Sequence, residues 1–386
     1  MDFQLTDEQR ALQDAARKFA STELPELARR IEEHAEPVPH DWLRRYAEMG
    51  FLGVNTPEAL GGLGLPLLDA LLVMEEFAKV SVAVAFPVFE CCTGPVRIVE
   101  RLASDALKNR IVPRAAAGEM LVAVSMSEPE AGTALTDLKT AARFDGEEIV
   151  LDGVKRWCSG AGHSGGYVIF CRFDGVPGAK GIGAVFVEMG TPGLSFGEQE
   201  KLMGFRGVPS ADIFLDNVRV PKANLLAGPG EFARLMGLFN IERLGNATMA
   251  LGVAAGALET VTGYVQERKQ FGKPIVDFQA VQLRLGDMAV KVEAARLLIH
   301  RAASNAGHGL PDPQEASIAK CFANEMTRAV CADALQLMGG YGYSREYGIE
   351  QKFRDSYGWG IAGGAIDIQK VNIAGALVGR RFSQRG

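Results

Sequence analysis

The sequence predicts an α+β protein in which an N-terminal helical domain is followed by a small antiparallel β domain and a C-terminal four-helix bundle. Apolar residues recur at helical spacing in the first part of the chain, short strand-like runs alternate with turns in the middle, and long amphipathic segments return afterwards. We therefore expect domains at 1–120, 121–228 and 229–386. Strands and helices do not alternate one for one, so a Rossmann fold is not expected.

The N-terminal domain is expected to consist of helices joined by loops, one of them at 61–64. Thr6 followed by Gln9 is a capping-box pattern, and apolar residues then recur at positions 12, 15, 16 and 19. This spacing places one apolar face on the first helix. Further helices are expected over 41–49, 67–77 and 95–114.

The middle domain is expected to be a compact antiparallel sheet. Asp145-Gly146 separates two short strand-like runs, 141–144 and 148–151, and is a common turn between paired strands. Frequent glycine and proline between such runs fits a sheet of short strands. Four more strands are expected, at 167–172, 183–187, 212–215 and 218–220.

The C-terminal domain is expected to be a bundle of long helices joined by short links. The helical pattern covers 231–269, 278–306, 313–338 and 365–382. The first of these carries many glycines and alanines between 245 and 257, which allow a helix or a flat ligand to approach its backbone. Each glycine costs about 1 kcal/mol of helix propensity, so close packing must compensate.

Composition excludes several classes of protein. The chain has 386 residues, 47% of them hydrophobic, and a formal net charge of −6, which argues against a nucleic-acid partner. Its six cysteines form no C-x-x-C pair, and its five histidines have no metal-ligand spacing. The start, MDFQLTDEQR, resembles neither a signal nor a transit peptide, and no uninterrupted apolar run approaches ~20 residues. We expect a cytoplasmic protein with reduced, buried thiols, no metal and no membrane partner.

Four stretches of the chain resemble motifs of one enzyme family. They are 126–133 (MSEPEAGT), 156–160 (RWCSG), 267–279 (ERKQFGKPIVDFQ) and 336–343 (QLMGGYGY) with Arg354-Asp355 after it. Their order and spacing resemble those of the acyl-CoA dehydrogenase flavoproteins over essentially the whole chain. The resemblance implies FAD as cofactor, an acyl-CoA substrate, an electron-transfer flavoprotein as electron acceptor, and a homotetramer or dimer.

The resemblance also implies which residues bind FAD. Thr133 would contact the pyrophosphate, Trp157 would pack beside the isoalloxazine ring, and Ser159 would lie near flavin N5. Arg268 would reach the FAD of a neighbouring subunit, as a bidentate phosphate donor. Taken alone, these stretches also fit a turn, a core tryptophan and a helix C-cap. The full set is Met126, Ser127, Gly132, Thr133, Trp157, Ser159, Arg268, Gln270, Phe271, Gln279, Gln336, Gly339 and Gly340.

The chain departs from the family at the catalytic base. Many members carry the basic glutamate in a Tyr-Glu-Gly-Thr stretch after the Arg-Asp pair, whereas 361–365 reads Ile-Ala-Gly-Gly-Ala and puts Gly363 there. Isovaleryl and long-chain members place the glutamate before an arginine at the start of the bundle, which here is Glu242-Arg243. The resemblance therefore implies Glu242 as the base, against the plain alternative of a solvated helix carboxylate. The first signature departs as well, because Thr133-Ala134 replaces the usual Ser-Asp.

The implied reaction is α,β-dehydrogenation of an acyl-CoA thioester. Glu242 would take the α-proton, hydrogen bonds would stabilise the thioester oxygen, and the β-hydrogen would leave as hydride to flavin N5. Burial should raise the pKa of the base toward working pH. Arg206, Ser210 and Arg243 are the implied substrate-binding residues.

The sequence is compatible with several alternatives. The same scaffold can support enoyl-CoA reduction or β-elimination of a sulfur group, and a carrier protein could replace CoA. A non-enzymatic DNA-associated relative is disfavoured by the acidic balance. Phe86 and Phe89, within 83–90, hint at a branched, cyclic or aromatic acyl group.

Overall fold

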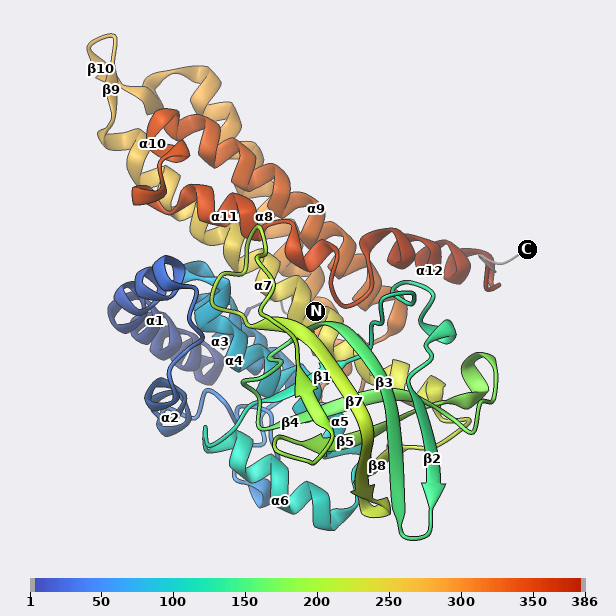
Figure 1. The fold of residues 1–386 in the computed structure, drawn as a ribbon. Helices are drawn as coiled ribbons and strands as arrows, with labels where there is room; N and C mark the ends of the chain where they lie inside the picture. The colour runs from blue at the N-terminus through green and yellow to red at the C-terminus, as the bar shows by residue number, and fades with distance from the viewer. Residues whose placement is uncertain (1–3, 383–386) are drawn as a thin grey trace.

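The computed structural model describes residues 4–382 and begins with a cluster of helices (Figure 1). These helices are α1 (Asp7–His34), α2 (His40–Glu48), α3 (Leu67–Val80), α4 (Val82–Cys92), α5 (Pro95–Leu102) and α6 (Asp105–Ala116). The capping box is confirmed, because the Gln9 amide donates to Thr6 Oγ1 at 3.2 Å and the Thr6 amide donates to Gln9 Oε1 at 3.1 Å. The helix expected over 95–114 is two helices instead, since the Ser104 side chain caps α6. Residues 1–3, part of the stretch expected to lack a targeting signal, lie outside the described residues.

The middle of the chain forms an eight-stranded sheet. Its strands are β1 (Val122–Ser125), β2 (Ala141–Asp145), β3 (Glu148–Ser159), β4 (Gly166–Phe173), β5 (Ile182–Glu188), β6 (Leu194–Phe196), β7 (Ser210–Pro221) and β8 (Leu225–Ala227). The order is β6-β7-β3-β2-β4-β5-β8, with β1 beside β4. The predicted hairpin is present, since Asp145 pairs with Glu148. The two strands expected at 212–215 and 218–220 are one continuous strand, β7.

The sheet is mainly antiparallel but not wholly so. β4 pairs in parallel with both β1 and β2, whereas the remaining pairs are antiparallel. The β2–β3 hairpin separates β1 from β4 in the chain, so this pairing is non-local and no turn motif announces it.

Helices return after β8 and continue almost to the end of the described chain. They are α7 (Phe232–Glu267), α8 (Gln279–Ala306), α9 (Pro313–Met338), α10 (Gly340–Tyr343), α11 (Ile349–Asp355) and α12 (Ile366–Val378), with a small hairpin of β9 (Lys269–Gln270) and β10 (Lys273–Pro274) between α7 and α8. Short 3-10 turns lie at Glu58–Leu60, Leu135–Asp137, Gly178–Gly181, Lys222–Asn224, Ile275–Asp277, Arg345–Tyr347 and Gly358–Gly360. The four predicted long helices are present within a few residues. The last of them, α12, packs on α9 and projects away from the other helices (Figure 1).

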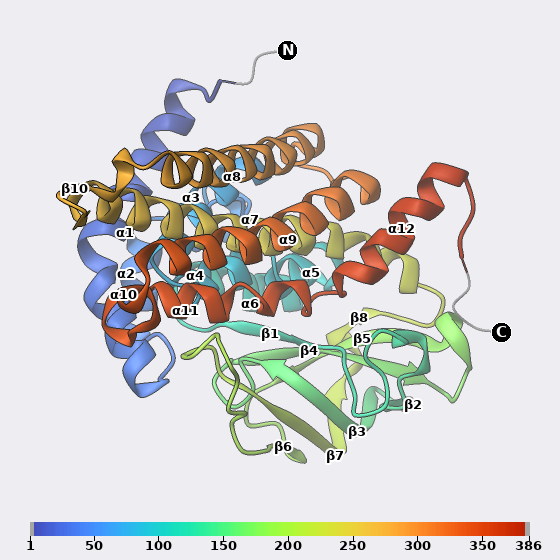
Figure 2. The ribbon, with the colours of Figure 1, turned by 90° about the horizontal axis from the view of Figure 1, so that it is seen from above.

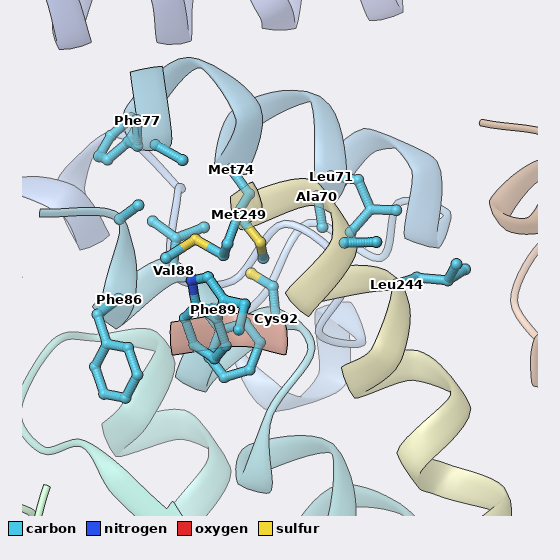
Figure 3. Close-up of a cluster of buried hydrophobic side chains, with 14 of the residues drawn as sticks. Ala70, Leu71, Met74, Phe77, Phe86, Val88, Phe89, Cys92, Leu244 and Met249 are labelled. Atoms are coloured by element: carbon cyan, nitrogen blue, oxygen red, sulfur yellow. The ribbon is translucent and has the colours of Figure 1, made fainter. Parts of the chain in front are cut away.

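The N- and C-terminal helices share one hydrophobic core. The sheet lies against this helical body in Figure 2, and residues of β4 and β5 such as Phe170 and Phe186 join the same core. Figure 3 shows Met74 and Phe77 of α3, Phe89 of α4 and Met249 of α7 within it. A second, smaller core lies within the β domain.

Glycine on α7 explains how closely the two sets of helices approach. A Cβ added to Gly252 would lie 2.5 Å from Ala78 Cβ and 2.7 Å from the Glu75 carbonyl oxygen on α3. The small residues of α7 therefore admit a neighbouring helix, which is one of the two possibilities that the sequence left open.

Residues 82–102 are long and apolar enough to cross a membrane by composition, with a mean hydropathy of 1.5. They form two helices, α4 and α5, and the most apolar part is wholly buried inside the protein. The segment is therefore core. All six cysteines are free and buried, as predicted.

Candidate active site

Glu242 lies on α7 near charged groups from three elements. Lys320 comes from α9, Arg243 follows on α7 itself, and Glu90 lies on α4. Burial raises the pKa of Glu242 to about 7, although the positive charges of Lys320 and Arg243 act in the opposite direction. Such a carboxyl can exchange a proton near neutral pH. The predicted upward shift of its pKa is therefore confirmed.

Gly363 faces Glu242 and leaves room for it. A Cβ at this position would lie 3.2 Å from Glu242 Oε1, 3.3 Å from Lys320 Nζ and 3.5 Å from Asn246 Nδ2. Gly363 also has φ +61°, in the left-handed region that favours glycine. A side chain at 363 would therefore crowd Glu242 and Lys320, which would have to shift by a few tenths of an ångström.

Lys320 is a buried cation that the sequence prediction missed. Its side chain is fully buried, and its Nζ donates to the carbonyl oxygens of Ala362 and Gly363, both at 2.7 Å. Burial lowers the pKa of Lys320 to about 7, and the nearby Glu242 charge opposes this shift. A signal was present in the sequence, because Lys320 falls at helical spacing with the buried Ala316 and Ala323.

Four aromatic side chains pack together beside the segment that precedes Gly363, and we call them the aromatic wall: Phe86 and Phe89 of α4, Phe205 and Trp359. The Trp359 ring centroid lies 4.8 Å from that of Phe89, 5.0 Å from that of Phe205 and 6.3 Å from that of Phe86. Gly358 makes room for Phe205, since an added Cβ would lie 2.3 Å from its ring. Trp359 was not among the predicted residues, and its position between Gly358 and Gly360 was the available signal.

Glu90 follows Phe89 and is itself buried. Burial, together with the charge of Glu242, raises its pKa well above the ordinary value. Among the residues between 4 and 382, its Oε2 finds no hydrogen-bond partner. The environment of Glu90 therefore favours its neutral form over the carboxylate.

The three predicted substrate-binding residues lie in different surroundings. Arg206 Nε donates to the Glu32 carbonyl oxygen at 2.8 Å, so its guanidinium is held against the end of α1. Ser210 pairs with Ser159 across β7 and β3, which brings a predicted substrate residue beside a predicted flavin residue. Arg243 donates to the Asn240 side chain, and its Nε is buried without a partner among the described residues.

One set of predicted FAD residues gathers on the β domain. Trp157 is 52% exposed with φ +61°, so the alternative that it is a core residue is wrong. The Arg156 guanidinium lies over its ring at 4.0 Å. Gly132 has open space where a Cβ would be. The set comprises Met126, Ser127, Gly132, Thr133, Trp157 and Ser159.

A buried ion pair supports the segment that contains this set. Lys155 Nζ donates to Glu128 Oε1 at 2.7 Å and to the Met126 carbonyl oxygen at 3.2 Å. Glu128 also accepts from the Thr140 amide at 2.9 Å. These bonds fix the 126–133 segment against β3.

The second set of predicted FAD residues surrounds a groove at the far end of the helices. The groove has a volume of about 710 Å³ and is lined by Arg268, Gln270, Gly339 and Gly340 among others. Phe271, on the β9–β10 hairpin, is 93% exposed. Gly339 is also the C-cap of α9, so the alternative interpretation of this glycine as a helix C-cap is correct and is compatible with its place in the groove. Gln279 begins α8 and Gln336 lies in the last turn of α9, both exposed.

The two sets lie at different ends of one chain, as the positions of β9–β10 and β3 in Figure 1 show. Both nonetheless suit FAD chemically. A guanidinium beside two glycines with open space above them fits an adenosine diphosphate, and an exposed tryptophan fits a flat ring system. Between residues 4 and 382, no group of three or more His, Cys, Asp or Glu side chains is arranged to hold a metal ion.

Comparison with known proteins agrees with these features. The acyl-CoA dehydrogenase N-terminal, middle and C-terminal domain families match residues 6–119, 123–218 and 232–378. The chain is 38% identical to acryloyl-CoA reductase (NADH) of Anaerotignum propionicum, over 98% of this chain and 97% of that protein. It is 36% identical to 3-sulfinopropanoyl-CoA desulfinase of Paraburkholderia xenovorans, over 99% of both. The structure of butyryl-CoA dehydrogenase from Megasphaera elsdenii matches with a TM-score of 0.94 and 31% identity, over 98% of this chain and all of that one. The chain therefore belongs to the acyl-CoA dehydrogenase family.

Proposed function

We propose that this protein catalyses the FAD-dependent α,β-dehydrogenation of an acyl-CoA thioester, with Glu242 as the base. The observation that carries the proposal is a partly buried carboxyl with a pKa of about 7 that lies beside Gly363. A carboxylate facing a glycine in this way is the arrangement that the relocated base of the isovaleryl and long-chain branches implies.

FAD is the cofactor of this chain, in keeping with its family. Trp157, Ser159 and Thr133 would hold the flavin and its pyrophosphate, and Arg268 with Gly339 would hold the adenosine diphosphate part. When bound, FAD supplies the hydride acceptor for the β-hydrogen.

The chain's own part in the reaction is to move a proton. Glu242 in its carboxylate form removes the α-proton, and burial stabilises the neutral acid that results. A pKa near 7 keeps a useful fraction of the carboxylate available at neutral pH while making it a stronger base than a solvated carboxylate. Phe86, Phe89 and Trp359 of the aromatic wall are buried, and Phe89 packs against Gly245, about one turn along α7 from Glu242.

Glu242→Gln tests the proposal. Flavin bleaching by a panel of acyl-CoA thioesters, measured anaerobically in a stopped-flow instrument, should slow by at least ~100-fold because a general base contributes roughly that much. Glu259→Gln is the matched control, since Glu259 is an exposed carboxylate on the same helix. Bleaching of the Glu242→Gln enzyme at the rate of the control would refute Glu242 as base.

A second candidate is enoyl-CoA reduction or β-elimination on the same scaffold. The likeness to acryloyl-CoA reductase and to 3-sulfinopropanoyl-CoA desulfinase favours it. In reduction, Glu242 as the neutral acid would donate the α-proton instead of removing it. Three mixtures separate the candidates. Reduced enzyme with a short enoyl-CoA tests reduction, oxidised enzyme with the saturated thioester tests dehydrogenation, and oxidised enzyme with a 3-sulfinoacyl thioester tests β-elimination. The mixture that turns over identifies the reaction.

We further propose an electron-transfer flavoprotein as the electron acceptor, a homotetramer or dimer as the assembly and the cytoplasm as the location. The separation of the two FAD sets within one chain supports an assembly in which a second copy completes each site. Light scattering on the purified holoenzyme measures the assembly. A monomer with full flavin content would contradict it.

A further inference from the structure

Lys320 has no role in the function proposed above, yet it lies beside the base. We propose that Lys320 is a positioning residue for Glu242, which clamps the Ala362–Gly363 turn and holds the carboxylate in its reactive form and place. The inference rests on the proposed function, because it assumes that Glu242 is the base.

The clamp is a pair of hydrogen bonds, which are charge-assisted when Lys320 is protonated. Lys320 Nζ bonds the carbonyl oxygens of two successive residues, Ala362 and Gly363, at 2.7 Å each. Asn246 Nδ2 reaches the same Ala362 oxygen at 3.4 Å, and its Oδ1 accepts from Asn324 at 3.1 Å. The turn is thereby tied to α7 and α9 at once, and it is fixed where Gly363 faces the carboxylate.

The clamp and the base meet at one point. Glu242 Oε1 and Lys320 Nζ both lie within 3.3 Å of the position that a Cβ would take on Gly363. A shift of the turn would therefore change the space open to the carboxylate. A misplacement of about 1 Å at a reacting group can slow a reaction by about 100-fold.

A neutral donor could also tie the turn, so the charge of Lys320 needs its own explanation. A buried ammonium is unfavourable unless acceptors and an opposite charge compensate for lost hydration. The charged or titratable groups that face Glu242 are Lys320 from α9, Arg243 from α7 and Glu90 from α4. Glu242 is the group that favours the charged form of Lys320 most strongly, so each group supports the charge of the other.

The pH dependence follows from this mutual support. The positive charge of Lys320 lowers the pKa of Glu242 and so opposes the effect of burial. Without that charge, burial would raise the pKa of the base further. The acid limb of the rate profile should then move to higher pH.

The experiment compares Lys320→Met with a matched control, Lys352→Met. Lys352 also donates to two backbone carbonyls, those of Lys79 and Val80, and it lies against Gly256, four helical turns along α7 from Glu242. Flavin reduction by acyl-CoA is measured from pH 5.5 to 9.5 for both holoenzymes. We expect the acid limb to shift upward by about one pH unit or more in Lys320→Met only.

A second readout does not depend on activity. Infrared difference spectra between the wild type and Glu242→Gln follow the protonated Glu242 carboxyl as the pH changes. Its titration should move upward in the Lys320→Met background and stay in place in Lys352→Met. Lys320→Gln, which removes the charge but keeps an amide donor, should show the same shift if Lys320→Met does not fold.

The outcomes separate this inference from the function on which it rests. Unshifted rate and infrared profiles in the Lys320 variants would overturn the positioning role, even if Glu242→Gln is inactive. Full activity of Glu242→Gln would overturn the proposed base instead, and the infrared titration would still report whether Lys320 controls the Glu242 carboxyl.

Discussion

Replacing Gly363 with alanine tests whether the space beside Glu242 is needed for the reaction. The added Cβ would lie 3.2 Å from Glu242 Oε1 and 3.3 Å from Lys320 Nζ, closer than ordinary van der Waals contact. Lys320 is held by two hydrogen bonds, so the carboxylate is the group that must move. The backbone at φ +61° adds a strain of about 1–2 kcal/mol for a residue with a Cβ.

Gly364→Ala is the matched control for this substitution. Gly364 has φ +86°, so it carries similar backbone strain, but its Cβ would meet the Gln369 side chain at 2.7 Å and would not touch Glu242. Both variants should lose about 1–2 kcal/mol of stability to backbone strain, and Gly364→Ala should lose somewhat more because its Cβ also displaces the buried Gln369 amide, which thermal unfolding would show.

The two variants should differ in rate. Anaerobic flavin bleaching at saturating acyl-CoA should slow by about 10- to 100-fold in Gly363→Ala and stay near the wild-type rate in Gly364→Ala. A Gly363→Ala enzyme that reacts as fast as Gly364→Ala would show that the glycine is there for the backbone alone. Gly363 would then not be needed to give Glu242 its space.

Two further predictions concern stability. Gly252→Ala should lower the free energy of unfolding, because overpacking against α3 costs about 1–3 kcal/mol and the gain in helix propensity returns only ~1 kcal/mol. Calorimetry should show this as a lower unfolding temperature. An unchanged unfolding temperature would mean that α3 and α7 can move apart at no cost. Burial raises the pKa of Asp355 to about 7. Its contribution to stability is therefore complete at a pH below the pKa of an aspartate in the unfolded chain, and it is lost as the pH rises through 7. Asp355→Asn removes this loss and keeps an acceptor for the Phe205 amide. The unfolding temperature of the variant minus that of the wild type should therefore increase from pH 5 to pH 8. A difference that stays constant over this range would contradict the prediction.

Much of the fold follows from local patterns, and its departures have physical causes. Capping at Thr6, the Asp145-Gly146 turn and the long helices of the bundle are local signals, and all three were predicted correctly. Helix α4 was not predicted as a helix because residues 82–92 are apolar on every side and contain Pro87, so neither periodicity nor propensity identifies it. The parallel pairing of β1 with β4 is non-local, and short strands carry no information about pairing direction.

The candidate site was predictable in its motifs and not in its electrostatics. The combination of Glu242 with Gly363 could be inferred from two separate stretches, and the structure brings both residues together. Trp359 and Lys320 were missed because each lies outside the resembling motifs. A lysine in a helix is usually solvated, and only the burial of its neighbours on α9 distinguishes Lys320.

The hydrophobic core that joins the first and last thirds of the chain has a consequence for its biosynthesis. Every residue of α4 is buried, and α7, which helps to cover it, is made only after the entire sheet. At a translation rate of about 5–20 residues per second, the nascent N-terminal helices wait on the order of 10–30 seconds for that cover. During this interval α1, α3 and α5 can already pack against α4, but the apolar face that α7 later covers has no partner. We expect that face to be the part of the N-terminal third that a chaperone for apolar nascent chains would bind.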